Sequence, residues 1–314
     1  MDGRLLPTRL LMVTQAASDV AAPAIAVVIP AFNPGAYLQR AVASVLVQSH
    51  ADWELVVVDD GGDEDLSWVG DCDPRVRLLR QANAGVSVAR NVGVAATSAP
   101  LIAFLDQDDE WLPTKLERQA RAMGDGGAAL CYSAFSWVRP DGSRDGDYTK
   151  PVTYESLLRD DHLCMSSVMV RRDLYLIAGG HDPKLAMMQD FDLFLRLLMD
   201  GALAVGVSER LVRYYLHGAN ASRDYRTAYR ERTWVLRAHQ RRAQRRGLPD
   251  VVAACRAGHA RSRSLYGCQA YDAFRASFRG AGFPGIAHLG RSLRWQPSVV
   301  ARGFSAASRK RFAR

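Results

Sequence analysis

The chain has 314 residues and a net charge of +8, with 48% hydrophobic and 24% charged residues. This composition is ordinary for a globular protein and excludes a disordered chain, while the length suggests one large or two modest domains. No stretch approaches the roughly 20 apolar residues that a transmembrane helix needs.

The charge is divided unevenly along the chain. From Arg223 to the C-terminus there are 21 Lys and Arg against 4 Asp and Glu. The preceding residues carry 20 Lys and Arg and 29 Asp and Glu. An acidic body with a basic tail implies two functions. We therefore expect a loose extension over residues 1–23, with Met1 or Met12 as the start, a folded body over 24–222, and a helical Arg-rich region over 223–314.

Five cysteines are present, an odd number with no C-x-x-C pair and no metal-ligand spacing. This usage fits reduced thiols in a cytoplasmic protein. The apolar run at residues 10–13 is too short for the core of a signal peptide. We therefore expect a cytoplasmic location.

Apolar, β-branched runs alternate with helical patterns in the first hundred residues. Residues 24–29 lie between Pro23 and Pro30 and predict a buried strand, and Pro34 suits the first turn of a helix to about Ser49. The pattern continues with strands at 55–58, 76–79 and 101–105 and a small-residue helix at 87–96. Such alternation predicts an α/β fold with a parallel sheet and right-handed crossovers.

The pattern changes beyond Trp111, whose side chain we expect to pack in the core. The expected elements are strands at 128–132, 135–138, 166–170 and 211–216 and an apolar helix at 191–199. From Arg223 the chain reads as helical, with breaks near 247–249 and at 280–285.

The acidic motif Asp106-Gln107-Asp108-Asp109 directly follows the apolar run at 101–105. Open α/β sheets bind their ligands at the carboxyl ends of the strands, so this motif brings three carboxylates to a ligand-binding edge. Like charges this close are unfavourable unless a cation neutralises them. Mg²⁺ prefers one or two carboxylates plus phosphate oxygens, so the motif predicts a metal that holds a diphosphate; the alternative is an acidic surface turn.

A second acidic pair, Asp59-Asp60, follows the strand at 55–58 and precedes two glycines. A loop that cradles a bare phosphate presents free N–H groups and positive charge, whereas this loop is acidic. A carboxylate at a strand end suits the donors of a base or a ribose. A solvated turn is the alternative.

Several segments between Ala24 and Ser222, taken in order, resemble the family 2 glycosyltransferases, which have a GT-A fold. The segments are Val28-Ile29-Pro30-Ala31-Phe32-Asn33, Val57-Val58-Asp59-Asp60-Gly61, Asn83-Ala84-Gly85, Ala89-Arg90-Asn91-Val92-Gly93, Phe104-Leu105-Asp106-Gln107-Asp108-Asp109 and Gln189-Asp190-Phe191-Asp192-Leu193. The resemblance implies a Rossmann-like, mostly parallel sheet with flanking helices, followed here by the helical basic region.

The resemblance also implies roles for particular residues. Asp190 matches the general base of the family's E-D pair, and Gln189 replaces the usual glutamate, which removes one neighbouring charge. Asp106 and Asp108 match the D-x-D motif, with Asp108 the more direct metal ligand, and Asp60 resembles the residue that pairs with the nucleotide base. The other implied donor-site residues are Pro30, Ala31, Asn33, Asn83, Arg90, Arg213 and His217, with Asn220 and Ser222 in a closing segment.

The implied activity is transfer of a sugar from a nucleotide-diphosphate donor, a UDP-sugar, to a glycan or lipid-linked acceptor in cell-surface polysaccharide synthesis. The transition state is oxocarbenium-like, as in glycoside hydrolysis. A divalent metal, Mn²⁺ or Mg²⁺, stabilises the leaving diphosphate, and a carboxylate takes the proton of the incoming hydroxyl. One base suffices for a single displacement with inversion.

Other functions stay open at this point. The segment around Ser87 approaches the nucleophile elbow of α/β-hydrolases, although its final glycine is alanine. A non-catalytic or nucleic-acid-binding protein with a basic arm is a further alternative. The arginines of 241–246 suit an anionic membrane surface, nucleic acid or a solvated face. For a transferase with a lipid-linked acceptor we expect peripheral contact with the inner face of the membrane, and no nucleic acid.

Overall fold

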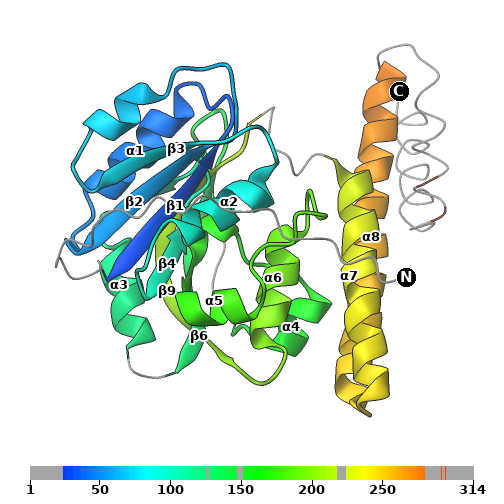
Figure 1. Ribbon diagram of the computed structural model, residues 1–314. Helices are drawn as coiled ribbons and strands as arrows, with labels where there is room; N and C mark the ends of the chain where they lie inside the picture. The colour runs from blue at the N-terminus through cyan, green and yellow to red at the C-terminus, as the bar shows by residue number, and fades with distance from the viewer. Residues whose placement is uncertain are drawn as a thin grey trace, which may run out of the picture.

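The computed structural model describes residues 24–124, 127–146, 151–217 and 224–279, together with 291 and 294 (Figure 1). Within these residues one mixed sheet is covered by helices on both faces. The strands are β1 (Ile25–Ala31), β2 (Trp53–Asp59), β3 (Val76–Arg80), β4 (Leu101–Phe104), β5 (Glu110–Trp111), β6 (Ala128–Val138), β7 (Arg144–Gly146), β8 (Val168–Arg171) and β9 (Leu203–Tyr215).

The helices are α1 (Tyr37–Leu46), α2 (Val86–Ala95), α3 (Lys115–Met123), α4 (Tyr154–Arg159), α5 (Arg172–Ile177), α6 (Gln189–Leu198), α7 (Tyr225–Arg245) and α8 (Pro249–Arg279), with 3₁₀ turns at Ser67–Asp71 and Met165–Ser167. In the described part of the chain, none of these helices is long and apolar enough to cross a membrane. The five cysteines form no disulfide.

The strand order is β3-β2-β1-β4-β8-β6-β9-β5, with β7 paired to β6. The first four strands pair in parallel, as do β6 and β9. The remaining pairs, β4–β8, β6–β8, β6–β7 and β5–β9, are antiparallel. The α/β fold predicted from the sequence is confirmed, and the carboxyl ends of β1, β2 and β4 meet at one edge.

The side chains of β1 alternate between two cores, because successive residues of a strand point to opposite faces. Ile25, Val27 and Ile29 pack in the cluster that includes residues of α1 and α3. Ala26 and Val28 pack in the cluster that includes residues of α2, α4 and α6. Burial on both faces explains why this strand is apolar throughout and reads as a continuous apolar run.

The sequence placed two strands at 128–132 and 135–138, and this division is wrong. β6 is one continuous strand, since it pairs with β8 and β7 on one side and with β9 along its length on the other. The small polar break at Ser133-Ala134 marks a register shift against β9 instead of a turn. The last strand also begins earlier than expected, at Leu203.

The helices α7 and α8 lie side by side along one flank of the sheet domain (Figure 1). The predicted break near residues 247–249 is confirmed, because Pro249 begins α8. Gly258 lets α8 pack closely on α4, where a Cβ would collide with the Leu158 carbonyl oxygen. The expected boundary at Ser222 falls in residues 218–223, outside the described part, as do the N-terminal extension and the break at 280–285.

Candidate functional site

A cavity of about 710 Å³ opens where β1, β2 and β4 end. It collects most of the residues that the sequence singled out: Pro30, Ala31, Asn33, Asp60, Arg90, Asp106, Asp108, Asp190 and His217. Residues of α7 and α8 complete the wall, which no sequence pattern indicated: Ala228, Leu265, Tyr266 and Gln269. The cavity is therefore shared by the α/β body and the helical region.

The acidic motif separates into carboxylates with different partners. Asp106 forms an ion pair with the buried Arg90 at 2.5 Å, and Asp108 accepts a hydrogen bond from Nε2 of His217 at 2.7 Å. Burial and the neighbouring charge of Asp106 raise the pKa of Asp108, while the bond from His217 acts in the opposite direction. Asp106 and Asp108 are thus the carboxylates of the motif that line the cavity.

Asp109 is buried and has a structural role. Its oxygens accept hydrogen bonds from the Ser166 hydroxyl at 2.5 Å and from the Tyr215 backbone N–H at 3.2 Å. Burial, with the charges of Asp106 and Asp108, raises the pKa of Asp109 well above its usual range. The side chain joins the acidic motif to the end of β9, and so it positions the segment that carries His217.

Two residues of α1 hold His217 in place. The ring of Tyr37 stacks on His217 with centroids 4.8 Å apart. The guanidinium of Arg40 lies over the Tyr215 ring at 3.6 Å and donates to the Asp108 carbonyl at 2.8 Å. Sequence reasoning missed Tyr37 and Arg40, because helix residues outside any motif give no such signal. Together they fix Asp108 and His217 as a preorganised pair.

The loops that follow β1 and β2 are hydrogen-bonded to one another and to neighbouring segments. Asn33 has φ +43° and its side-chain oxygen accepts the Asp63 N–H at 2.8 Å. Asp60 is buried and accepts from Gln81 and from the N–H groups of Ala84 and Gly85. Because a carboxylate has about four acceptor positions, Asp60 keeps one for a ligand.

Asp190 lies in the first turn of α6 and lines the same cavity. Burial and the charge of Asp161 raise its pKa to about 7, against the opposing effect of Arg90. Asp161, whose own pKa burial raises to about 6, lies 3.6 Å from the buried Arg232. Asp161, which sequence reasoning missed, is therefore a second carboxylate whose charge acts on Asp190.

The segment before Asp190 is held by a single carboxylate of α7. Glu231 is buried and accepts the backbone N–H groups of Ala186, Met187 and Met188 at 2.8 to 3.1 Å. These bonds satisfy three donors just before α6 begins. Helix α7 therefore orients the candidate base, although it lies outside the segment that carried the family motifs.

Some predicted residues lie elsewhere. Asn83 is exposed and does not line the cavity, and Arg213 pairs with Glu110 at 2.5 Å on the β5–β9 ladder. Asn220 and Ser222 lie outside the described residues. Ser87 is buried, and its hydroxyl donates to the Leu185 carbonyl at 3.3 Å instead of to a histidine. This contact gives no support to the hydrolase alternative.

Comparisons with known proteins address the family of the chain. Residues 26–168 match the model of glycosyl transferase family 2. A Bacillus subtilis protein named as a teichuronic acid biosynthesis glycosyltransferase, TuaG, is 30% identical over 223 residues, which cover 68% of this chain and 87% of TuaG. The chain belongs to glycosyl transferase family 2.

This glycosyltransferase is also similar to a further relative and to a solved structure. The Escherichia coli UDP-Glc:α-D-GlcNAc-diphosphoundecaprenol β-1,3-glucosyltransferase WfgD is 29% identical over 186 residues, 57% of this chain and 72% of WfgD. The crystal structure of S. aureus TarS 1–349 in complex with UDP-GlcNAc aligns with a TM-score of 0.60 at 14% identity, over 89% of this chain and 92% of that chain. The GT-A fold implied by the motifs is confirmed.

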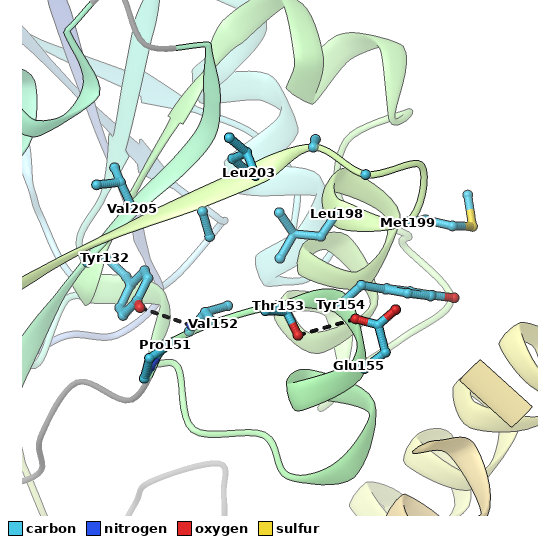
Figure 2. Close-up of a pocket in the computed structure, with 14 residues that line it drawn as sticks. Tyr132, Pro151, Val152, Thr153, Tyr154, Glu155, Leu198, Met199, Leu203 and Val205 are labelled. Carbon is cyan, nitrogen blue, oxygen red and sulfur yellow. Dashed lines mark hydrogen bonds between the residues drawn. The ribbon is translucent and has the colours of Figure 1, made fainter. Parts of the chain in front are cut away.

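The glycosyltransferase has a second cavity, of about 650 Å³, which Figure 2 shows. Its lining comes from β6, β9, the start of α4 and the end of α6, and it shares no residue with the candidate active site. The Tyr132 hydroxyl accepts the Val152 N–H at 3.1 Å at its wall. None of the predicted site residues lines it.

Proposed function

We propose that this family 2 glycosyltransferase moves a sugar from a UDP-sugar to a hydroxyl of a glycan or lipid-linked acceptor, with inversion at the anomeric carbon. The observation that carries the proposal is that Asp108 and Asp190 line one cavity at the carboxyl edge of the sheet. The displacement needs a group that stabilises the leaving diphosphate and a group that accepts the proton of the incoming hydroxyl. Asp190 suits the second task, and Asp108 suits the first through a divalent cation that it would hold.

The residues of the acidic motif fit a divalent cation. Asp108 is desolvated beside Asp106, and the pKa of Asp108 is raised for that reason, so added positive charge would be favourable there. In the described part of the chain no group of three potential ligands comes together. Mg²⁺ and Mn²⁺ need only one or two carboxylates besides substrate phosphates, and Asp108 with Asp106 supplies these. When bound, the cation would stabilise negative charge on the leaving diphosphate.

The chain's own residues would perform the other steps. Asp60 offers its remaining acceptor position to the donor's base, and the loops of Pro30, Ala31 and Asn33 enclose the nucleotide. Arg90 balances the charge of Asp106 beside the diphosphate. The Asp190 carboxylate accepts the proton of the acceptor hydroxyl as that oxygen attacks the anomeric carbon from the face opposite the leaving group, which gives inversion.

The choice of donor and acceptor is supported by the relatives. TarS has been solved in complex with UDP and with UDP-GlcNAc. WfgD is named for a UDP-glucose donor and a diphosphoundecaprenol-linked acceptor, and TuaG for teichuronic acid biosynthesis. We therefore propose that this chain acts in cell-surface polysaccharide synthesis, in the cytoplasm at the inner face of the membrane, with the Arg-rich region in peripheral contact with anionic lipid.

The test is turnover with a panel of nucleotide sugars in the presence of Mn²⁺ and of lipid-linked glycan acceptors. We expect acceptor-dependent release of UDP, and NMR of the product should show the anomeric configuration opposite to that of the donor. Release without inversion would contradict the single-displacement mechanism. Absence of turnover with every nucleotide sugar would contradict the activity itself.

A further inference from the structure

A groove of about 450 Å³ runs between α7 and α8, apart from the candidate active site. Its lining comes from one face of each helix: Tyr229, Thr233, Arg237, Gln240, Arg241 and Gln244 of α7, and Arg256, His259 and Arg263 of α8. Every one of these side chains carries a hydrogen-bond donor, and none is a carboxylate. Such a lining favours an anion.

Four arginines of the helical region lie outside the groove lining and form ion pairs. Arg242 and Arg246 pair with Asp200, Arg261 with Asp160 and Arg232 with Asp161. Within the described residues, no ion pair involves the four groove arginines, which are Arg237, Arg241, Arg256 and Arg263. The sequence after Arg279 has seven Lys and Arg and no Asp or Glu side chain.

Two further features of the groove favour an anionic ligand. The Thr233 hydroxyl is buried and has no hydrogen-bond partner among the described residues, a situation that costs stability unless a ligand or solvent satisfies it. The pKa of His259 is lowered by burial and by the charges of Arg237, Arg263 and Arg232.

We propose that this groove binds a phosphate or diphosphate ester, and that this group belongs to the acceptor substrate. Guanidinium groups recognise phosphate through paired, charge-assisted hydrogen bonds, and four of them line the groove with the amides of Gln240 and Gln244. The four arginines are exposed, so a ligand in solution can reach them. The assignment to the acceptor rests on the proposed glycosyl transfer.

The groove leads toward the active site. Tyr229 lines the groove, and its ring packs on the ring of Tyr266 with centroids 5.8 Å apart. Tyr266 and Ala228 line the candidate active site. Along α7, Arg237 and Arg241 lie about 14 to 20 Å from Ala228, at about 1.5 Å per residue. An acceptor phosphate held there would therefore be separated from the attacking hydroxyl by more than one sugar unit.

The first test follows the native protein while inorganic diphosphate is added in metal-free buffer, where the proposed donor site does not compete. NMR titration of the His259 ring, assigned with His259→Gln, should show its pKa rising as the anion binds. An unchanged His259 signal at saturating diphosphate would overturn the proposal. This measurement needs no variant of the groove arginines, and it is independent of UDP binding.

The second test compares two double variants by calorimetry. We expect Arg241→Gln with Arg256→Gln to weaken diphosphate binding at least about tenfold, because two charge-assisted contacts are lost. The matched control, Arg242→Gln with Arg246→Gln, removes the same charge from residues outside the groove lining and should leave binding unchanged. Equal weakening by both pairs would overturn the discrete site, as would binding to phosphatidylglycerol vesicles without any binding of diphosphate.

The acceptor assignment has its own readout. With a prenyl-diphosphate-linked oligosaccharide as acceptor, the groove variant should raise the acceptor KM at least about fivefold and leave kcat and donor binding unchanged, as expected for lost ground-state binding. Weakened diphosphate binding with an unchanged acceptor KM would overturn the assignment to the acceptor. Loss of donor binding alone would instead count against the proposed function.

Discussion

At Asp190, burial and the charge of Asp161 raise the pKa to about 7. Only the ionised carboxylate accepts a proton, so kcat/KM should fall about tenfold for each pH unit below 7 and level off above it. Asp190→Asn should lower kcat about 10²–10⁴-fold while metal-dependent donor binding stays nearly intact. Steady-state kinetics from pH 5 to pH 9, with calorimetry of donor binding, measure both effects. Near-native turnover by Asp190→Asn would disprove the base assignment.

The charge of Asp161 offers a second test of the same pKa. Asp161→Asn removes a negative charge that raises the pKa of Asp190, so the rise of the pH–rate profile should move to lower pH. The variant Asp200→Asn changes an exposed carboxylate elsewhere and should leave the profile in place. A profile that does not move in Asp161→Asn would show that another group controls the reaction.

The residue-level predictions from sequence succeed where the motif is local. Asp106 and Asp108 were predictable because they follow a strand directly, and they do meet at the sheet edge with Asp60 and Asp190. Asp161 was not predictable, since a single acid in a polar segment has no distinguishing pattern. Its proximity to the charge of Asp190 arises only in the folded chain.

At the scale of elements, α7 supports the active site through Glu231. Glu231→Gln keeps the shape but removes the charged acceptor of three backbone N–H groups, and loss of such buried bonds costs about 1–3 kcal/mol. We expect a lower free energy of unfolding by this amount and a reduced kcat, because residues 186–188 position Asp190. Chemical denaturation and steady-state kinetics measure the two effects.

The control for this variant is Glu209→Gln, at an exposed ion pair with Arg118 at 3.4 Å. Exposed pairs contribute about 0–1 kcal/mol, so both stability and kcat should stay near the native values. If Glu231→Gln behaved like Glu209→Gln, α7 would have no positioning role. That outcome would mean that residues 24–222 position the active site without help from the helical region.

The elements themselves were largely predictable, and the reason is their periodicity. β1, β2 and β4 are buried on both faces and therefore apolar throughout, and the break between α7 and α8 coincides with Gly247 and Pro249. β6 was divided wrongly because the small residues Ser133 and Ala134, where its register against β9 shifts, resemble a loop in the sequence. The docking of α7 and α8 on the active site depends on long-range contacts, which no local pattern encodes.

At the scale of the whole molecule, the basic helical region against the acidic body predicts an interaction with anionic membranes. The full chain should float with phosphatidylglycerol vesicles at low salt and much less at high salt, as the Debye length falls below about 8 Å. Phosphatidylcholine vesicles are the control and should bind weakly. Equal absence from both vesicle types would mean that the arginine-rich face is solvated or intramolecular.

The central claim is that the cavity at the sheet edge binds a nucleoside diphosphate with a divalent cation held by Asp108. Calorimetry with UDP, with and without Mn²⁺, tests it most directly on the native chain, on Asp108→Asn and on the surface control Asp200→Asn. We predict metal-dependent UDP binding by the native chain and by Asp200→Asn, and loss of both UDP and metal binding in Asp108→Asn. Failure of every nucleoside diphosphate to bind the native chain, with or without Mn²⁺, would contradict the account.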